Sequence, residues 1–531
     1  MKPTDSNPWP WETLSSWAWA PAAWRGLAAG VIVWLLLRFL RPPTKPPGYP
    51  PGPMVLPLVG NFGLTFSYNL PKAMQKMVNK YGLVCGCYLG SLPMVVVSGY
   101  HTVKEALLQN GHKLSDRPPF PLVDVLLSGT GIVNAPYGEA WKQQRRFALH
   151  TMRNFGLGRT ILENFILQEA QHLMERFPKK GEPFDLHLSM HNAASNVICC
   201  LMFGHRFSYD DEMFKKMLRL IERNLKLEGN YVGMMCNIFP FIMKLPGPQQ
   251  ELFRNQKELD DFIKEEILQH KKSQQQGKPR DLIDAHLDKI DEGSMNTQEI
   301  FSEQNLIAVV NDLFVAGTET TSTTLRWAFL YMMAYPDVQE KCWKEINKVA
   351  GTDALLSMDL RSSMPYVEAV LHEVQRMSDI VPFGVGHYTT HDITINNYHI
   401  PKLTWNEVQG SLCDGASSVR PSKAIVIFNL TSVLNDPGQW KSPGEFRPER
   451  FLDEEGRFQK PEAFLPFSAG PRVCLGEALA KMELFLFFTS ILQKFQFVWP
   501  DPLSKPDLVP VYSFVQVPKP HNIVVHKRVG A

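Results

Sequence analysis

Ten residues near the carboxyl end, Phe467 to Gly476, constrain this chain more than any other segment. They place Cys474 in a loop that also carries Gly470 and Arg472, just before an apolar run, Glu477 to Phe488, that predicts a helix. A nearby cation and a helix N-terminus both favour the thiolate, which is the form of cysteine that binds metals. The glycines allow a flat group to approach the backbone closely. The loop therefore predicts a thiolate ligand held against a helix.

The pattern F-x-x-G-x-R-x-C-x-G is matched at every specified position, by Phe467, Gly470, Arg472, Cys474 and Gly476. A lone cysteine is more often a buried structural residue, and that is the alternative for Cys474. The complete pattern instead predicts that Cys474 is the axial ligand of a haem iron and that the other four residues lie against the cofactor.

Composition and charge set wider limits. The chain has 531 residues and is 44% hydrophobic, so it can bury a large core. Its formal net charge is only +2 and no basic stripe accompanies it, which gives no reason to expect nucleic-acid binding. Its eight cysteines lack the spacing of a disulfide framework or a zinc site, which favours a reducing environment. Without repeats or long linkers after residue 53, residues 54–531 are expected to form one catalytic domain.

The amino-terminal region, residues 1–41, is predicted to be a single-pass membrane anchor. The segment Ala22 to Leu40 can span a bilayer if Arg25 and Arg38 reach the interfaces, and the basic residues that follow it place the rest of the chain in the cytosol. A cleaved signal peptide is the alternative. A proline-rich hinge, residues 42–53, would then hold the domain off the membrane.

Hydrophobic spacing predicts a mainly α-helical protein with a minor β region. The longest periodic segment, Glu299 to Tyr335, is expected to form one central helix that stops at Pro336. Further helices are expected at 256–272 and 336–350, and short strands at 94–97, 393–400 and 425–430. The glycosylation sequon at Asn429 lies in a predicted apolar strand, so we attribute it to chance.

Small and polar residues interrupt the middle of the long predicted helix, from Ala316 to Thr321. The hydroxyl of Thr320 can bond the carbonyl of Ala316 four residues back, and Gly317 would leave space beside it. With Glu319, this would form a polar notch suited to holding O₂ and supplying protons. The alternative is that Thr320 bonds only its own helix and Glu319 faces solvent.

Two further constellations carry charge. Glu373 and Arg376 share a helical face, and Arg450 in the P-E-R-F segment would complete a buried Glu–Arg–Arg cluster. Four other side chains offer hydrogen-bond donors to the two propionates of a haem. These donors are Trp141, Arg145, His387 and Arg472. Taken singly, each pattern is also typical of an exposed ion pair or an ordinary amphipathic helix.

The motifs described above resemble those of a cytochrome P450, and the resemblance covers the chain from about residue 50 to the end. In chain order they are W-x-x-x-R, A-G-x-E-T-T, E-x-x-R, P-E-R-F and the cysteine loop. The anchor and hinge resemble the microsomal class. Segments Arg146–Gly158, Phe241–Pro248 and Asp312–Trp327 are similar to family 2, nearest to subfamily J. The resemblance implies the P450 fold, haem b as cofactor, and a place in the endoplasmic reticulum membrane with the catalytic domain facing the cytosol.

The implied activity is that of a monooxygenase, which uses O₂ and NADPH-derived electrons to hydroxylate or epoxidise lipophilic substrates, such as arachidonate and other fatty acids or xenobiotics. Thr320 and Glu319 would deliver protons. The substrate pocket would be lined by Phe314, Ala316, Val381, Phe383, Val385 and Phe514. The implied partners are NADPH–cytochrome P450 reductase, cytochrome b5 as a further candidate, the lipid membrane and a lipophilic small molecule. The apolar segment Met234 to Leu245 would either dip into the membrane or pack in the core.

The chain departs from the family pattern at three places. An insert, residues 403–423, replaces a short Gly-Thr turn before the strand that begins near Ala424, while Pro471 stands where Lys or Arg is usual and Gly386 where Pro is usual. Loop-closure entropy penalises the insert by only about 1 to 2 kcal/mol. The fold should therefore survive. A haem-binding variant with impaired catalysis, a haem sensor and an isomerase of hydroperoxides are the competing functions.

Overall fold

The computed structural model describes Gly30, Lys45 and residues 47–56, 59–65, 67, 69–90, 92–127, 129–158, 160–178, 181–293, 300–401 and 424–528. The predicted anchor, apart from Gly30, the first part of the hinge and the insert at 403–423 lie outside these ranges. Among the described residues, no helix is both long enough and apolar enough to cross a bilayer.

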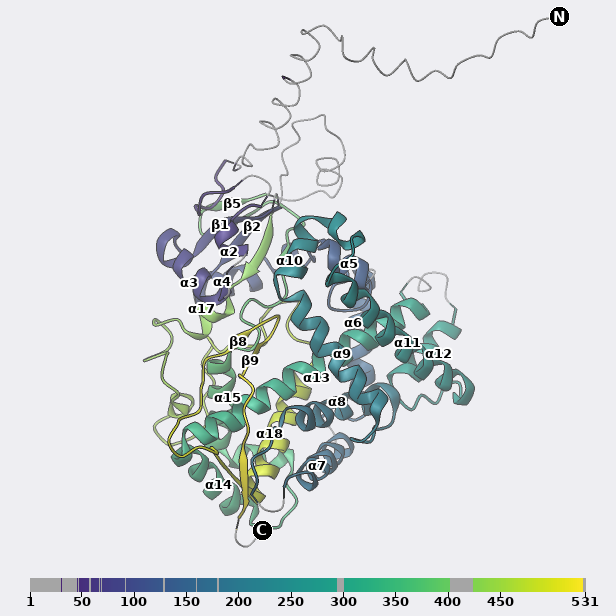
Figure 1. Ribbon diagram of the computed structural model, residues 1–531, viewed down its shortest axis with the longest axis vertical. Coiled ribbons are helices and arrows are strands. Elements are labelled where there is room, and N and C mark those ends of the chain that lie inside the picture. Colours follow the sequence, from purple (N-terminus) through teal and green to yellow (C-terminus); the bar gives the residue numbers. More distant parts are fainter. Residues whose placement is uncertain are drawn as a thin grey trace, which may run out of the picture.

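Helices form most of the protein, and a small sheet lies at one end of it (Figure 1). The α-helices are α2 (Phe62–Thr65), α3 (Leu70–Tyr81), α4 (Tyr100–Leu108), α5 (Pro121–Leu127), α6 (Glu139–Asn154), α7 (Thr160–Glu175), α8 (His187–Phe203), α9 (Glu212–Glu228), α10 (Tyr231–Ile238), α11 (Gln249–Ser273), α12 (Leu282–Asp291), α13 (Glu303–Ala334), α14 (Pro336–Ala350), α15 (Pro365–Ser378), α17 (Leu430–Leu434) and α18 (Glu477–Lys494). Short 3₁₀ turns are η2 (Gly111–Lys113), η3 (Pro240–Lys244), η4 (Met358–Ser363) and η5 (Pro448–Phe451).

The main sheet has the strand order β1-β2-β6-β3 and is mixed. Strand β2 pairs antiparallel with β1 and parallel with β6, and the short β3 closes the sheet antiparallel to β6, with His387 opposite Val426. Three two-stranded sheets are formed by β4 with β5, β7 with β10, and β8 with β9. The strands are β1 (Val84–Leu89), β2 (Leu92–Val97), β3 (His387–Tyr388), β4 (Ile393–Ile395), β5 (Tyr398–Ile400), β6 (Ile425–Phe428), β7 (Phe495–Val498), β8 (Val511–Tyr512), β9 (Gln516–Val517) and β10 (Val524–Lys527). The predicted mainly helical class with a minor β region is confirmed.

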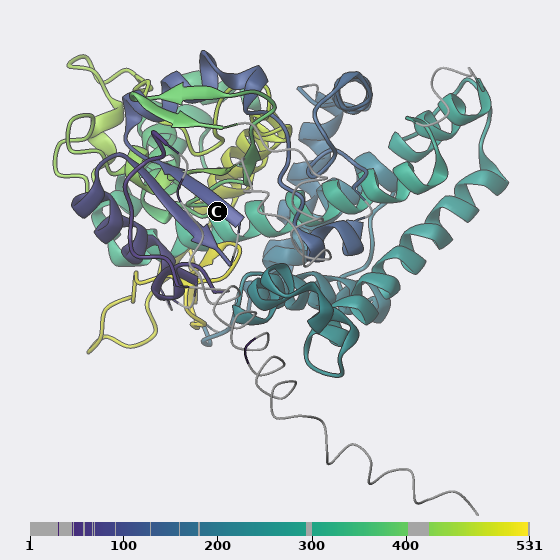
Figure 2. The same ribbon diagram turned by 90° about the horizontal axis from the view of Figure 1, so that it is seen from above.

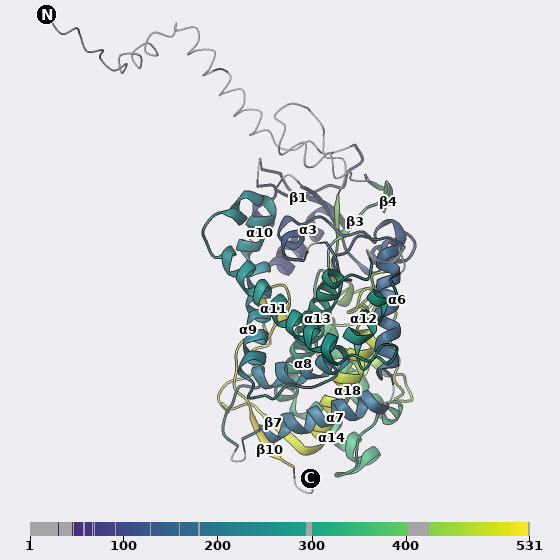
Figure 3. The ribbon, with the colours of Figure 1, turned by 90° about the vertical axis from the view of Figure 1, so that its right-hand side faces the viewer.

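Helix α13 is the central element and crosses the helical part of the molecule (Figures 1 and 3). It begins at Glu303 because the side chain of Ser302 caps it, accepting a hydrogen bond from the N–H of Asn305. It ends at Ala334, and Pro336 then starts α14. The predicted long helix is therefore confirmed over 303–334.

Helix α18, which follows the cysteine loop, is deeply buried beside α7 and α13. Its middle, from Met482 to Gln493, is buried at every position, so its burial is not confined to one face. Seen from above, the sheet lies on one side of the molecule, whereas α11 and α12 extend on the other (Figure 2). Helix α18 therefore anchors the end of the cysteine loop, at Gly476, against the central helix α13.

Asn429 is buried and already has partners in the fold. Its side chain caps α17 by accepting from the N–H of Ser432, and it donates to the hydroxyl of Ser98. Only 2% of its surface is exposed. The sequon at this position is thus part of the packed interior, but Asn429 lies just after β6 and not within the predicted strand. The seven described cysteines are all free thiols.

Candidate active site

The cysteine loop is closed by its own backbone. The N–H of Cys474 donates to the carbonyl of Phe467 at 3.0 Å, and the N–H of Val473 donates to that of Gly470 at 3.1 Å. Gly470 has a φ of +76°, and a Cβ there would lie 2.4 Å from the carbonyl oxygen of Leu107. Only glycine fits this position. A Cβ on Gly476 would meet only the Cys474 Sγ, at 4.0 Å, so a side chain there would point toward the thiol.

The thiol of Cys474 is exposed on one side and enclosed by protein on the others. Burial raises the pKa of this thiol, whereas the N–H groups of Gly476 and Glu477 and the guanidinium of Arg145 lower it. The predicted helix N-terminus is therefore present at the sulfur. The cation is not the predicted one, because Arg145, held by the carbonyl of Val473 at 2.6 Å, faces the thiol and Arg472 points elsewhere.

Arg472 and Trp141 meet over a shared carbonyl. Arg472 donates to the carbonyls of Ser115, Ile132 and Ala135, and Trp141 Nε1 also donates to Ile132, at 2.9 Å. The Arg472 guanidinium lies 4.1 Å from the centre of the Trp141 ring, a cation–π contact. The predicted donors Trp141, Arg145 and Arg472 are therefore brought together on one side of the cysteine loop.

The fourth predicted donor, His387, is buried in strand β3. Its Nδ1 donates to the carbonyl of Leu114 at 2.7 Å, which fixes the ring. Burial and the nearby Arg117 and Arg472 lower its pKa to about 3, so this imidazole is neutral.

Arg117 joins this group, and sequence reasoning missed it. Its guanidinium donates to the carbonyls of Val133, Val385 and Gly386. Burial and the nearby Arg472 lower the pKa of Arg117 to about 9. It lies in a loop without periodicity, and its only local signal is the charged pair Asp116-Arg117 before Pro118. Its partners lie far away along the chain, so the fold alone reveals its place.

The three guanidinium groups of Arg117, Arg145 and Arg472 form what we call the arginine cluster. Among the described residues, none of them makes an ion pair with a carboxylate within 4 Å. Burial and mutual repulsion lower the pKa of Arg472 to about 10. Asp116 and Asp312 offset part of this charge from beyond ion-pair distance. An enclosed concentration of positive charge without close ion pairs is suited to binding anionic groups.

Asp312 of α13 fixes the turn that serves the arginine cluster. Its Oδ2 accepts hydrogen bonds from the N–H groups of Ile132 and Val133 at 2.7 and 2.9 Å. A Cβ on Gly131 would lie 2.4 Å from the same oxygen, so this turn also requires glycine. Burial raises the pKa of Asp312 to about 6. The central helix thereby orients the carbonyl of Ile132 to which Trp141 and Arg472 bind.

Thr320 of α13 lines a small cavity together with the cysteine loop. Its hydroxyl donates to the carbonyl of Ala316 at 2.6 Å, as predicted, and Ala316 is exposed. A small cavity of about 40 Å³ runs between α13, the end of α15, the cysteine loop and α18. It brings together Thr320, Val381 and Phe467.

The predicted role of Gly317 is wrong. A Cβ at this position would lie 2.4 Å from Ile198 Cδ1 on α8. Gly317 therefore allows close packing between α13 and α8, and it does not open space beside Thr320.

Glu319 faces away from Thr320. Successive helical residues are rotated by about 100°, and the Glu319 carboxylate points toward α8, where Oε2 lies 3.4 Å from His191 Nε2. Only 5% of Glu319 is exposed, so the alternative of a solvent-facing acid is also wrong. Burial raises the pKa of Glu319 to about 7.

The predicted pocket residues do not all share one wall. Val381 lines the small cavity, the carbonyl of Val385 bonds Arg117, and Phe514 is 42% exposed. Phe383 is buried, with its ring 6.2 Å from that of Tyr512. Phe314 is fully buried in an aromatic cluster on the other side of α13 from Ala316, which is a correction to its predicted place. This cluster contains Phe203, Phe214 and Phe262.

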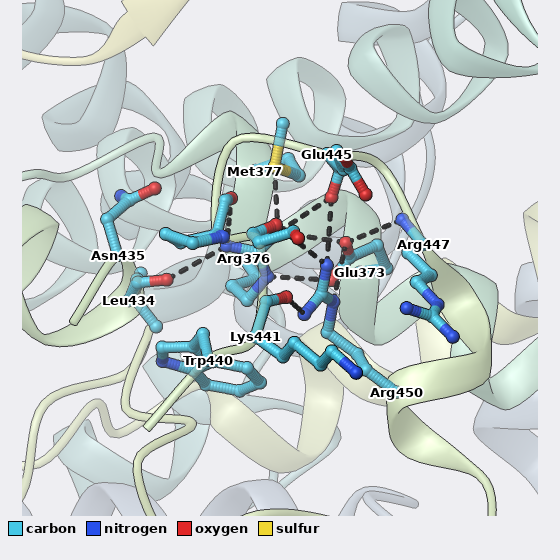
Figure 4. A network of polar contacts seen from close by, with 12 residues as sticks. Glu373, Arg376, Met377, Leu434, Asn435, Trp440, Lys441, Glu445, Arg447 and Arg450 are labelled. Carbon is cyan, nitrogen blue, oxygen red and sulfur yellow. Dashed lines mark hydrogen bonds and ion pairs between the residues drawn. The ribbon is translucent and has the colours of Figure 1, made fainter. Parts of the chain in front are cut away.

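The Glu–Arg–Arg cluster forms as predicted (Figure 4). Both oxygens of Glu373 accept from Arg376, and Oε1 also accepts from Arg450 Nε at 3.0 Å. The remaining donors of Arg376 reach backbone carbonyls, including that of Leu434 at 2.9 Å. The cluster ties α15 to η5 and to the segment that leads into the cysteine loop.

Comparison with known proteins decides the family. The family model described as Cytochrome P450 matches residues 50–405 and 418–525. This chain belongs to the cytochrome P450 family. It is 43% identical over 487 residues to cytochrome P450 2J2 of Homo sapiens, which covers 91% of this chain and 93% of the relative. It is 41% identical over 510 residues to cytochrome P450 2D15 of Canis lupus familiaris, covering 94% and 98%.

Cytochrome P450 2J5 of Mus musculus is similar at 42% over 481 residues, with 90% and 91% covered. As a P450, the protein is a monooxygenase of lipophilic substrates with a haem-thiolate cofactor and a reductase as redox partner. The predicted family 2 relationship is confirmed. The interval between the two matched segments, 406–417, falls inside the insert.

Proposed function

We propose that this P450 hydroxylates or epoxidises lipophilic substrates in the endoplasmic reticulum membrane, with its catalytic domain in the cytosol as residues 54–531. The observation that carries the proposal is the arginine cluster beside the cysteine loop. It combines three guanidiniums, none of which has a close ion pair among the described residues, with an exposed thiol that accepts from backbone N–H groups.

These residues fit haem b. Cys474 would ligate the iron, while Arg117, Arg145 and Arg472 would receive the two propionates. Trp141 and His387 would join them only after a change of partner, because their N–H groups already donate to the carbonyls of Ile132 and Leu114. The loop residues Phe467, Gly470 and Gly476 would lie against the ring. When bound, the haem supplies the activation of O₂ and the insertion of one oxygen atom into the substrate.

Thr320 and Glu319 would supply the protons that oxygen reduction consumes. The Thr320 hydroxyl is held by the carbonyl of Ala316, so its oxygen stays at a fixed point on the wall of the site. Glu319, with a pKa raised to about 7, would exchange protons at neutral pH. Because it faces α8, it would have to change rotamer or act through water to reach the Thr320 side.

The substrate would lie against apolar side chains, which favours a fatty acid such as arachidonate or a xenobiotic. Ala316, Val381, Phe383, Val385 and Phe514 remain the proposed lining. The partly exposed Phe514 lies at the tip of the β8–β9 hairpin, where its backbone approaches Gly229 at the end of α9.

The outer face of α6 is the proposed docking surface for the reductase. A groove of about 460 Å³ runs along it and includes the basic side chains Lys142, Arg146 and Arg153 as well as Pro471. An acidic redox partner would complement this charge. Cytochrome b5 would be a second partner for the same surface.

Replacing Pro471 with Lys tests the docking surface. The family usually carries a base there, so Pro471→Lys is expected to lower the concentration of reductase needed for half-maximal NADPH turnover. Pro471→Gln is the control, because it removes the same packing against Gly111 without adding charge. Equal reductase affinity in both variants would contradict this part of the proposal.

Membrane contact is proposed through the anchor and through exposed apolar side chains. Met54 is 81%, Tyr231 65% and Phe241 62% exposed, the last two lying in and after α10. Large exposed apolar residues near a hinge and a substrate entrance are suited to a lipid surface.

An impaired haem-binding variant is the second candidate, because of the insert. Residues 403–423 immediately precede β6, and Val426 of β6 pairs with His387 of β3. Excising the insert and restoring Gly-Thr tests this. Equal haem per chain would favour the active enzyme, and a clear rise on excision would favour the impaired variant.

The first experiment is the carbon monoxide difference spectrum of the reduced, haem-loaded chain. We expect the strongly red-shifted band of a thiolate ligand, and Cys474→Ser should abolish it. NADPH consumption coupled to oxygenated product would then establish the monooxygenase. Product formed from a hydroperoxide alone would favour an isomerase, and haem binding without any product would favour a sensor.

A further inference from the structure

A buried histidine faces the acid beside Thr320. His191 of α8 is 2% exposed, and its Nε2 lies 3.4 Å from Oε2 of Glu319. Among the described residues, neither atom has a hydrogen-bond partner. The other oxygen of Glu319 accepts from Thr323 at 3.4 Å. Two unsatisfied polar atoms in one buried contact indicate a site where a proton is shared or moved.

The contact continues toward the surface along α8. His187, one helical turn before His191, meets it edge to face with 4.5 Å between the ring centres. Nε2 of His187 lies 3.9 Å from Oε1 of Glu222 on α9, and both side chains are about a quarter exposed. Glu222 in turn pairs with the exposed Lys226. The line from Lys226 through Glu222, His187 and His191 therefore joins solvent to Glu319.

The charges around this line are mixed. Burial and neighbouring cations lower the pKa of His191 and of His187. The groups that face them are Glu222 and Lys226 of α9, Arg326 and Glu319 of α13, and Asp185 before α8, while His521 lies near Arg326 and Asp185. Both imidazoles are therefore neutral at neutral pH, and each would carry a positive charge only briefly, during proton transfer. Groups of this kind can transfer protons, whereas a permanently charged histidine would form a fixed ion pair.

We propose that His187 and His191 form a proton relay that connects Glu222 at the surface to Glu319 inside the protein. The relay rests on the proposed function, in which Glu319 takes part in proton delivery. A proton from hydronium or a buffer acid in solvent binds His187 at the nitrogen facing Glu222, leaving water or the buffer base, and a proton from the other ring nitrogen passes to His191. His191 releases a proton from Nε2 to Oε2 of Glu319, so one carboxylate becomes one carboxylic acid and both rings end neutral. No electrons move, and the ring-to-ring step requires rotation of a side chain.

The test follows exchange of the Glu319 proton in the haem-loaded, full-length chain. About one unit below its pKa of about 7, Glu319 is mostly protonated, and its carbonyl stretching band in the infrared shifts on transfer to D₂O. The band is assigned by its loss in Glu319→Gln. We expect His191→Asn and His187→Gln to slow the isotope shift at least about tenfold, because each removes a group that both accepts and donates protons.

His286→Asn is the matched control, since His286 is equally buried but packs against Phe147 and Phe301. It should exchange at the wild-type rate. Wild-type exchange in both relay variants would overturn the relay. If His191→Asn does not fold, His187→Gln decides alone, because the His187 side chain is about a quarter exposed. The measurement needs no turnover, so a missing carbon monoxide band would count against the proposed function without affecting the relay.

Discussion

Glu373 accepts hydrogen bonds from two guanidinium groups and from the N–H of Arg447, although none of its side-chain surface reaches solvent. A buried carboxylate of this kind is stable only because both of its oxygens accept hydrogen bonds and two guanidiniums balance its charge. The same rule separates the residues of the candidate site. Arg117 and Asp312 are important to the site because both are enclosed, and a buried polar group that loses a hydrogen bond destabilises the folded protein. The surface ion pairs add little to the free energy of unfolding.

Glu373→Gln is expected to lower the free energy of unfolding by about 3 to 5 kcal/mol, because it leaves two enclosed guanidiniums without a counter-charge. Urea unfolding followed by fluorescence measures this as a lower midpoint. Glu455→Gln is the control, since Glu455 pairs with Arg457 at the surface, and its midpoint should not move. A wild-type midpoint in Glu373→Gln would show that the cluster carries no stability.

Asp379 makes stability depend on pH. Burial raises its pKa from 3.8 to about 7, so the folded protein holds a proton that the unfolded chain releases between these values. Stability should therefore be highest below pH 3.8, as far as this group is concerned, and fall as the pH rises through about 7.

Asp379→Asn removes this dependence and keeps the acceptor for Thr431, and Asn tolerates the left-handed backbone at this position, where φ is +42°. The variant should gain on the order of 4 kcal/mol relative to wild type between acid and neutral pH. Urea midpoints measured across this range check it. The exposed Asp359→Asn should follow wild type, and parallel curves for Asp379→Asn would contradict the assignment.

At the scale of elements, α13 is a central helix, and a different segment of the chain packs against each of its faces. Its Asp312 face holds the 131–133 turn, its Thr320 face lines the cavity, and its Gly317 face packs on α8. The Glu319 face meets His191. A helix with four different neighbours cannot show a single apolar stripe, which explains why its motif residues have separate roles.

Gly317→Ala should destabilise the protein by about 1 to 3 kcal/mol, since the new methyl would overlap Ile198 on α8. In an Ile198→Ala background the same change should be neutral or stabilising, because space is available and alanine favours helix by up to about 1 kcal/mol. Denaturation midpoints of the four proteins give the coupling energy. Additive effects would show that the two helices do not meet at this point.

Across the whole molecule, the cysteine loop bridges two hydrophobic cores. Phe464 belongs to the core on the sheet side, whereas Leu479 belongs to the helical core. The arginine cluster likewise draws on the loop after α4, on α6 and on the cysteine loop. A ligand bound there would therefore contact, and hold together, segments that are far apart in the sequence.

Removing haem should therefore lower the thermal unfolding midpoint of the entire protein by roughly 5 to 10 °C, since a ligand that binds only the folded state stabilises it by mass action. Differential scanning calorimetry of the loaded and haem-free chain measures this. In Arg117→Met, the difference in midpoint between the haem-loaded and haem-free chain should be smaller, because anion binding is weakened. An unchanged difference would show that Arg117 does not contribute to haem binding.

Local signals were sufficient for the helical class, for the bounds of α14, for the Thr320 bond to Ala316 and for the Glu–Arg–Arg cluster. Each of these features depends either on residue spacing along one helix or on a short sequence motif that itself contains the interacting residue. The cysteine loop belongs to the same group, because its closing hydrogen bonds, the positive φ of Gly470 and the following helix are local, although the contact of Gly470 with Leu107 is not.

Only the tertiary structure decided which residues meet across the chain. Arg145 rather than Arg472 faces the thiol, Phe314 turns into the core, and Glu319 meets His191 instead of Thr320 or solvent. The sequence determined that a cysteine loop, a polar notch and several buried charges would exist, since these follow from local backbone and motif chemistry. Their partners follow from the packing of helices against one another, because the rotation of each helix about its axis is set by contacts that spacing along the chain does not record.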